Sequence, residues 1–130
     1  MIKVWVNGVF DILHYGHIKL FEFAKSQGDY LTVGIDTDKR VKFLKGDSRP
    51  INDEQARMKV LKAIKYIDKV VMFDYDEELI DILKMYHPNI FVIGRKYENK
   101  HIIGAEHAQK IVYYDRIGDY STTNIINKLK

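Results

Sequence analysis

The chain has 130 residues, 46% of them hydrophobic, which suits one sizeable core and predicts a single domain over residues 1–130. Its 21 basic and 18 acidic residues are scattered along the length, which argues against nucleic acid as the main partner. The absence of cysteine excludes disulfides and thiolate chemistry, and no apolar run resembles a signal or membrane span, so we expect a cytoplasmic protein with no membrane partner.

Short apolar runs rich in Val and Ile alternate with helical patterns from the first residues onward. The runs are typical of strands that are buried on both faces of a sheet. They cover residues 2–6, 31–35, 70–73, 90–93 and 111–113. This alternation predicts an α/β fold, a doubly wound (Rossmann-like) parallel five-stranded sheet with helices on both faces.

Apolar residues at helical spacing predict the helices between these strands. The helices are expected over residues 17–27, 53–66 and 76–86, and a short last helix is expected to begin at Ser121 or Thr122. Asn52, with Gln55 three residues later, resembles a capping box before the second helix. Three segments are expected to form loops at the carboxyl edge of the sheet, where such folds bind ligands: residues 7–16, 36–52 and 94–106.

The loop after the first strand carries the strongest local pattern. Gly8 permits a tight exit from the strand, and Gly16 removes a side chain where a ligand could approach the backbone. His14 and His17 are three residues apart, so both imidazoles are expected on one side of an opening helical turn, where the helix start attracts anions. On spacing alone, two alternatives stay open: polar residues at a helix entry, or a metal-binding pair.

The run over residues 8–17, GVFDILHYGH, resembles the G-x-F-D-x-x-H-x-G-H signature of the cytidylyltransferase-like branch of nucleotidyltransferases. Residues 44–52 and 54–58, and residues 121–126, look like the adenylyltransferase domain of bacterial ADP-heptose synthases. Arg116, ahead of the Ser-Thr-Thr of residues 121–123, looks more like glycerol-3-phosphate cytidylyltransferase.

This resemblance implies transfer of a nucleoside monophosphate from a nucleoside triphosphate to a phosphorylated sugar or polyol, with release of pyrophosphate. The expected substrates are ATP and a heptose-like sugar 1-phosphate, a precursor of cell-envelope sugars, with CTP and glycerol 3-phosphate as the alternative. Mg²⁺ is expected as the cofactor, chelated largely by phosphate oxygens rather than by protein ligands. Relatives are commonly homodimers. A non-catalytic nucleotide-binding module is the alternative of another class.

The resemblance also assigns residues. The expected catalytic residues are His14, His17, Lys45 and Arg57. Arg57 is expected to contact a phosphate; the alternative is a pair with Asp53 on an exposed helix face. The expected nucleotide- and phosphate-binding residues are Gly8, Val9, Phe10, Gly16, Gly94, Arg116, Ser121, Thr122 and Thr123. Weaker candidates near the acceptor are Asp11, Asp36, Asp38 and Arg49; Asp11 is expected to hold a loop rather than to act as a base.

Two segments depart from the relatives. Where relatives usually carry an aspartate in a G-D-D-W or G-G-D-Y run, this chain has Gly94-Arg95-Lys96-Tyr97, which reverses the local charge. In residues 116–123 the glycine is moved by one place relative to the R-T-x-G-x-S-T-T pattern. Because of both changes, the sequence does not decide which nucleotide base the site selects.

Overall fold

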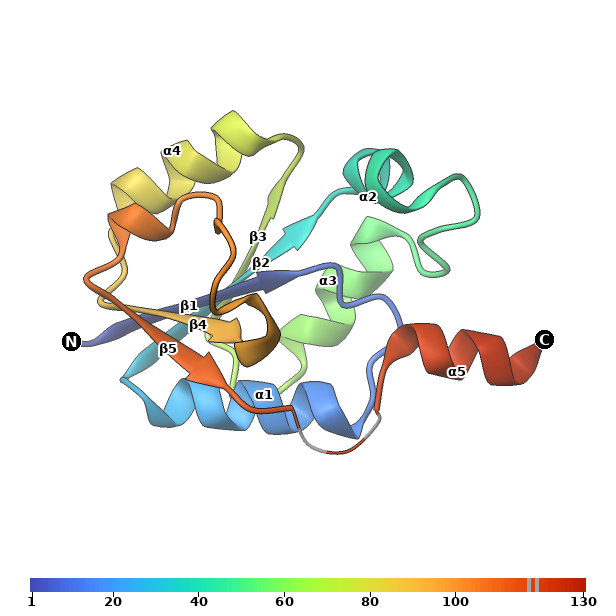
Figure 1. Cartoon of the computed structure of the whole chain (residues 1–130), viewed down its shortest axis with the longest axis horizontal. Helices are drawn as coiled ribbons and strands as arrows, with labels where there is room; N and C mark the ends of the chain where they lie inside the picture. Colours follow the sequence, from blue (N-terminus) through green and yellow to red (C-terminus); the bar gives the residue numbers. More distant parts are fainter. Residues whose placement is uncertain (117, 119) are drawn as a thin grey trace.

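The computed structural model describes residues 1–116, 118 and 120–130. Its centre is a sheet of five parallel strands in the order β3-β2-β1-β4-β5 (Figure 1). The strands are β1 (Lys3–Gly8), β2 (Tyr30–Asp36), β3 (Lys69–Phe73), β4 (Ile90–Gly94) and β5 (Lys110–Tyr114). The predicted five-stranded, parallel, doubly wound fold is confirmed, and each strand lies within two residues of its expected bounds.

Helices connect the first four strands and follow the last one, and they cover both faces of the sheet. They are α1 (Tyr15–Ser26), α2 (Asp38–Lys45), α3 (Glu54–Lys62), α4 (Asp76–Tyr86) and α5 (Thr122–Leu129). Two short 3₁₀ turns, η1 (Arg95–Tyr97) and η2 (Ala105–His107), lie between β4 and β5. Among the residues described, no helix is both long and apolar enough to cross a bilayer.

The core has two layers because side chains on a strand alternate between the faces of the sheet. On β1, Val4 and Val6 pack with Phe21 of α1 and Leu61 of α3. Trp5, between them, points to the other face and packs with residues of α4 and of the segment around η2. Burial of each such apolar side chain contributes about 1.5–3 kcal/mol, so these two layers hold the loops at the carboxyl edge in place.

The second connection differs from the sequence-based expectation. The sequence pattern predicts a loop over residues 36–52, yet these residues contain α2, which Thr37 caps by accepting a hydrogen bond from the Arg40 amide at 3.3 Å. The next helix, α3, is capped by Asp53, not by Asn52, and it ends at Lys62 rather than at residue 66. Lys45 is therefore the last residue of a helix, and its side chain extends from the end of that helix.

The topological switch point lies between β1 and β4. β1 pairs with β2 through six residues, from Lys3 to Gly8. With β4 it pairs only at Val4 and Trp5, so the β1–β4 ladder stops well before the carboxyl ends of the two strands. Ligands of open α/β sheets bind at this position, and a cavity lies here.

Candidate active site

The cavity has a volume of about 760 Å³ and is formed by the loop after β1, the end of α2, the ends of β4 and β5, and the start of α5. Fifteen of the seventeen residues expected at the site line it; Arg57 and Asp38 do not. Those that do are Gly8, Val9, Phe10, Asp11, His14, Gly16, His17, Asp36, Lys45, Arg49, Gly94, Arg116, Ser121, Thr122 and Thr123.

The two histidines at the start of α1 cap the helix together. His14 is the N-cap residue, and its Nδ1 accepts a hydrogen bond from the Gly16 amide at 3.1 Å. The Nδ1 of His17 accepts from the His14 amide at 3.3 Å, which completes a capping box. The ring centroids are 3.8 Å apart. The two imidazoles therefore lie on one side of the first turn, as the spacing predicts, although the helix begins at Tyr15 and not at residue 17.

These hydrogen bonds fix the chemistry of both rings. Because each Nδ1 accepts, the neutral imidazole carries its proton on Nε2, which remains available as a donor. Burial, aided by the charge of Arg116, lowers the pKa of His14. Burial, together with the neighbouring His14 and Arg116, lowers the pKa of His17 from 6.5 to about 4. At neutral pH the free site thus offers two uncharged N–H donors.

The start of α5 lies beside the start of α1 (Figure 1). Thr122 Oγ1 donates a hydrogen bond to the Ile12 carbonyl at 2.8 Å, joining residues that are 110 positions apart. Ser121 caps α5 by accepting from the Asn124 amide at 3.0 Å. The Tyr120 ring stacks 6.3 Å from that of His14. Two helix N-termini, each with a partial positive charge, therefore face one cavity, which suits a phosphate chain.

Arg116 brings a permanent charge to the same wall. Its Nη2 donates to the Tyr120 carbonyl at 2.7 Å, which ties the end of β5 to the start of α5. The side chain lines the cavity. Ile117 and Asp119, which belong to the run compared with the R-T-x-G-x-S-T-T pattern, lie outside the described residues.

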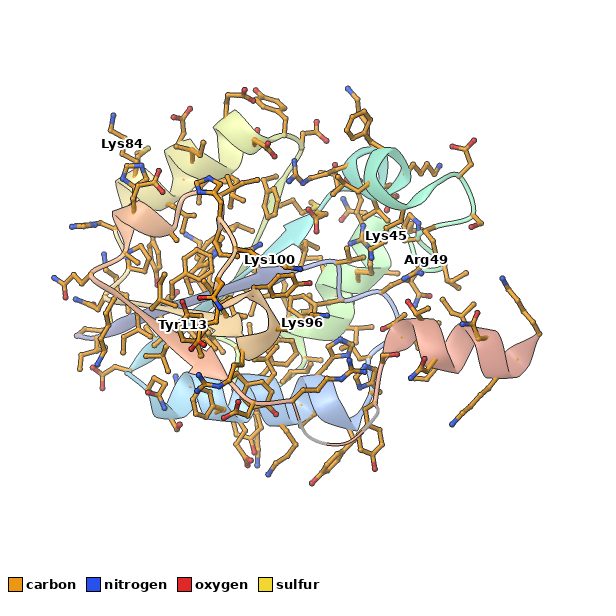
Figure 2. All side chains as sticks on the ribbon, viewed as in Figure 1. Lys45, Arg49, Lys84, Lys96, Lys100 and Tyr113 are labelled. Carbon is orange, nitrogen blue, oxygen red and sulfur yellow. The ribbon has the colours of Figure 1, made fainter. Side chains whose placement is uncertain are left out.

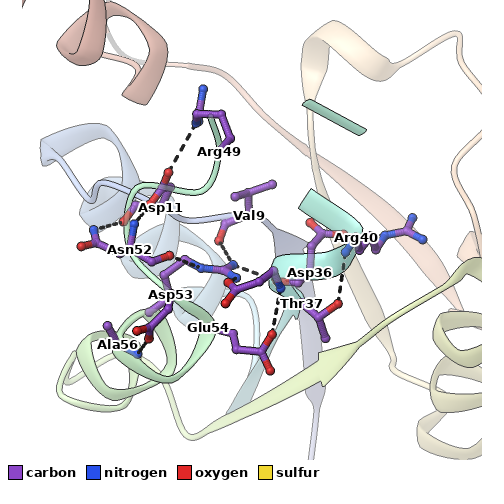
Figure 3. Close-up of polar contacts among 12 residues, drawn as sticks. Val9, Asp11, Asp36, Thr37, Arg40, Arg49, Asn52, Asp53, Glu54 and Ala56 are labelled. Carbon is purple, nitrogen blue, oxygen red and sulfur yellow. Dashed lines mark hydrogen bonds and ion pairs between the residues drawn. The ribbon is translucent and has the colours of Figure 1, made fainter. Parts of the chain in front are cut away.

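Asp11 holds the segment that follows α2 (Figure 3). Its carboxylate accepts hydrogen bonds from the Ile51 amide at 2.7 Å and the Asn52 amide at 2.8 Å, and it pairs with Arg49 at 3.4 Å. The Asp11 side chain has no exposed surface. These contacts agree with the loop-holding role expected of Asp11 and place Arg49 at the cavity wall.

Arg57 is buried and joins three segments of the carboxyl edge. Its Nε donates to the Asn52 carbonyl at 3.0 Å, and its Nη1 donates to the carbonyls of Val9 at 2.9 Å and Asp36 at 2.8 Å (Figure 3). Its Nη2 pairs with the Asp38 carboxylate at 2.8 Å. The guanidinium therefore fixes the loop after β1, the end of β2 and the start of α3 relative to one another.

This geometry corrects two expectations about Arg57. The side chain is 0% exposed and does not line the cavity, so a direct phosphate contact is not formed here. The alternative of an exposed pair with Asp53 is also wrong, because Asp53 accepts instead from the Ala56 amide at 2.8 Å. Asp38, expected near the acceptor, pairs with Arg57 and does not line the cavity either.

The β2 side of the cavity carries one free cation and one neutralised carboxylate. Lys45 lines the cavity, and among the described residues no carboxylate pairs with it. Asp36 also lines the cavity, but its carboxylate pairs with the Arg40 Nε at 2.6 Å. Arg40 in turn pairs with Asp76 at 2.8 Å. The positive potential of this wall therefore comes mainly from Lys45, because the adjacent Arg49 is paired with Asp11.

Residues 5–128 match the family model described as cytidylyltransferase-like. The chain belongs to this family. The resemblance drawn from the loop after the first strand is thereby confirmed, as is the expected enzyme class, a nucleotidyltransferase. Members of the cytidylyltransferase-like family generally use a divalent metal ion, a nucleoside triphosphate and a phosphorylated acceptor.

Similar proteins agree with this assignment. The chain is 45% identical over 127 residues to the Bifunctional protein HldE of Campylobacter fetus, covering 98% of this chain and 28% of that protein. It is 39% identical to the protein of the same name from Aliarcobacter butzleri, covering 98% of this chain and 26% of that protein. The chain thus spans about a quarter of the length of the curated relatives it matches.

Solved structures show the same fold. A lipopolysaccharide core biosynthesis protein from Thermoplasma volcanium superposes with a TM-score of 0.69 at 28% identity, covering 93% of this chain and 99% of that one. Pantothenate synthetase from Thermus thermophilus superposes with a TM-score of 0.66 at 13% identity, covering 96% of this chain and 61% of that one, which is a likeness of fold alone.

The end of β4 in this cytidylyltransferase-like chain carries two basic residues, and they differ in their contacts. Arg95 is held by the protein: it pairs with Asp115 at 2.5 Å and with Glu98 at 2.8 Å. The Lys96 ammonium lies over the Tyr97 ring, 5.0 Å from its centroid, and pairs with no carboxylate among the described residues. Arg95 therefore braces η1 against the end of β5, whereas Lys96 is available to a ligand.

Several lining residues were not found from the sequence. Tyr97, Ile102 and Tyr114 also line the cavity, and Asn52 braces its wall by donating to the Asp11 carbonyl at 2.9 Å. The tyrosines have no distinguishing pattern among nine in the chain. Backbone contacts such as those of Asn52 leave no signature in the sequence.

Proposed function

We propose that this nucleotidyltransferase moves the adenylyl group of ATP to a heptose-like sugar 1-phosphate and releases pyrophosphate. The observation that carries the proposal is the meeting of two helix N-termini, with the Nε2–H donors of His14 and His17, in one cavity. The similarity to a lipopolysaccharide core biosynthesis protein supports a sugar acceptor. The stretches over residues 44–58 and 121–126, which look like those of ADP-heptose synthases, support a heptose.

The reaction needs positioning and positive charge more than it needs acid–base chemistry. An oxygen of the acceptor phosphate attacks the α-phosphorus, and the bond between that phosphorus and the oxygen bridging to the β-phosphate breaks. Pyrophosphate leaves with the electron pair. The acceptor phosphate is already ionised at neutral pH, so no protein base has to remove a proton. Negative charge grows on the transferring and leaving groups, where fixed donors are most effective.

The residues of the cavity supply these donors. His14 and His17 donate from Nε2 to the transferring phosphate, and the start of α5 at Ser121–Thr123 receives the leaving pyrophosphate. Arg49, on the β2 side, holds the acceptor phosphate, and the adjacent Lys45 contacts the triphosphate. We assign Arg57 a positioning role, since it acts through the backbone that it binds.

The described residues fit a divalent ion that arrives with the nucleotide. Among them, no group of three or more His, Asp or Glu side chains could hold a metal ion. Both carboxylates of the cavity wall, Asp11 and Asp36, already have cationic partners. Mg²⁺ bound to the phosphate oxygens would supply further positive charge to the triphosphate, and the protein would contact the phosphates around it.

The test is pyrophosphate release by the purified chain, with ATP and CTP each combined with heptose 1-phosphates, other sugar phosphates and glycerol 3-phosphate. The proposal expects the highest kcat/KM for ATP with a heptose 1-phosphate. A preference for CTP and glycerol 3-phosphate would favour the alternative to which Arg116 points. Nucleotide binding without turnover of any pair would instead indicate a binding module. The homodimer and the cytoplasmic location stay predictions.

A further inference from the structure

The charges that face the cavity are strongly unbalanced. Among the described lining residues, the cationic side chains outnumber the carboxylates by five to two. The cations are Lys45, Arg49, Arg95, Lys96 and Arg116, and the carboxylates are Asp11 and Asp36. In a cleft with apolar walls, an excess of one sign focuses the field on a ligand of the opposite sign.

Part of this charge is used within the protein. Asp11 pairs with Arg49 at 3.4 Å, and Asp36 pairs with Arg40 at 2.6 Å, so neither carboxylate is left to attract a cation. Arg95 is bound by two carboxylates that lie outside the cavity lining. The charge that the cavity lining presents to a ligand is therefore positive.

Three cations have no carboxylate partner among the described residues: Lys45, Lys96 and Arg116. They come from three different parts of the chain around one cavity, namely the end of α2, η1 and the segment after β5. Figure 2 shows Lys45 beside Arg49 and Lys96 nearer to the ends of β4 and β5. A triphosphate seated at the starts of α1 and α5 would have cations on both sides.

We propose that Lys96 binds the triphosphate directly and that, with Lys45 and Arg116, it lets the site bind the nucleotide without a divalent ion. The inference rests on the proposed function. A carboxylate at position 96 would repel a free triphosphate unless a metal ion lay between them. An ammonium attracts the phosphates itself, so Lys96 lets the protein supply part of the neutralisation that a metal ion would otherwise supply.

The experiment is calorimetric titration of the chain with ATP and with CTP, once with excess EDTA and once with Mg²⁺. The wild type is expected to bind its nucleotide in EDTA with a Kd within about fivefold of the value in Mg²⁺. Lys96→Gln should weaken binding in EDTA about tenfold, and Lys96→Asp on the order of a hundredfold. Mg²⁺ should recover most of the loss in Lys96→Asp, because an ion can then lie between carboxylate and phosphate.

The chain provides a matched control in Lys100. Its ammonium lies over the same Tyr97 ring, 5.6 Å from the centroid, but the residue does not line the cavity. Figure 2 labels both lysines. Lys100→Gln removes the same charge from the same segment, so it should bind the nucleotide as the wild type does in both buffers. Circular dichroism of each variant checks that the fold is kept.

Each other outcome has a distinct meaning. Wild type that binds the nucleotide in Mg²⁺ but not in EDTA overturns the inference and leaves the proposed function standing. Binding by Lys96→Gln that is indistinguishable from binding by Lys100→Gln likewise overturns the inference alone. A folded wild type that binds neither ATP nor CTP in either buffer overturns both the inference and the proposed function.

Discussion

His17 performs two tasks with its two ring nitrogens, and a pair of substitutions can separate them. Its Nδ1 accepts from the His14 amide and caps α1. Its Nε2–H is the donor that we assign to the transferring phosphate. Asparagine places an acceptor near the position of Nδ1 and nothing at Nε2, whereas glutamine places a donor near Nε2 and nothing at Nδ1.

The expected effects follow from the size of each interaction. His17→Asn keeps the cap but loses the edge-on contact with the Phe10 ring, whose centroid is 5.4 Å away, so its stability should fall by about 1 kcal/mol. Loss of one donor to developing charge should lower its kcat by about 10²–10³. His17→Gln should lose about 1 kcal/mol with the cap, yet its kcat should fall by less than about tenfold because a donor remains.

Two measurements test whether the two nitrogens of His17 have separate tasks: initial rates of pyrophosphate release at saturating substrates, and urea unfolding of the same preparations. The reasoning is refuted if folded His17→Asn turns over at the wild-type rate. It is also refuted if the two variants are equally impaired in rate, since the donor position would then be irrelevant and only the cap would matter.

Two further predictions concern stability. The pKa of His17 is lowered from 6.5 to about 4, so the folded state favours the neutral ring. The stability that this preference adds above pH 6.5 is lost as the pH falls towards 4, and the loss is on the order of 3 kcal/mol. Urea unfolding at both pH values should show a smaller loss in His17→Asn, which cannot titrate; equal losses would contradict the assignment. Arg57→Met should cost about 3–5 kcal/mol, because it leaves Asp38 and three carbonyls unpaired. Thermal unfolding should register a drop of roughly 10 °C or more, and a change under about 2 °C would contradict the bracing role.

The strands could be predicted because each is a short, nearly continuous apolar run. The runs end early at polar residues and glycines, and this explains why β1 extends to Gly8 and β2 to Asp36, beyond their expected ends. Those extra residues are the ones that line the cavity. The apolar runs thus predict the sheet, but they underestimate the length of β1 and β2 at the ends that line the cavity.

The apolar pattern does not predict helix α2, because this helix has almost no buried face. Of its eight residues only Val41 is buried, and Phe43 is 87% exposed, so no apolar stripe repeats at helical spacing. Its end signals are present all the same: Thr37 is a favourable N-cap, and Gly46 follows the last turn with a φ of 95°. The caps of this helix therefore indicate it where periodicity cannot.

The candidate site was predictable where it depends on the start of a helix, and less so where it depends on tertiary contacts. The pairing of His14 and His17 follows from their spacing within one turn. The burial of Arg57 does not, because its partners are mostly carbonyl oxygens of distant segments, and any residue type can provide these. The difference between Arg95 and Lys96 is likewise set by the neighbours of each side chain.

The short ladder between β1 and β4 has a consequence for how the protein keeps its shape. Only Val4 and Trp5 pair across this junction, so the half built on β1, β2 and β3 meets the half built on β4 and β5 along a weak line of backbone hydrogen bonds. Residues of both halves line the cavity, so a nucleotide bound there as proposed would contact both and hold them together. By mass action, a ligand at one hundred times its Kd adds about 2.7 kcal/mol to the free energy of unfolding. The resting concentration of substrate in a cell would then set how often the two halves separate.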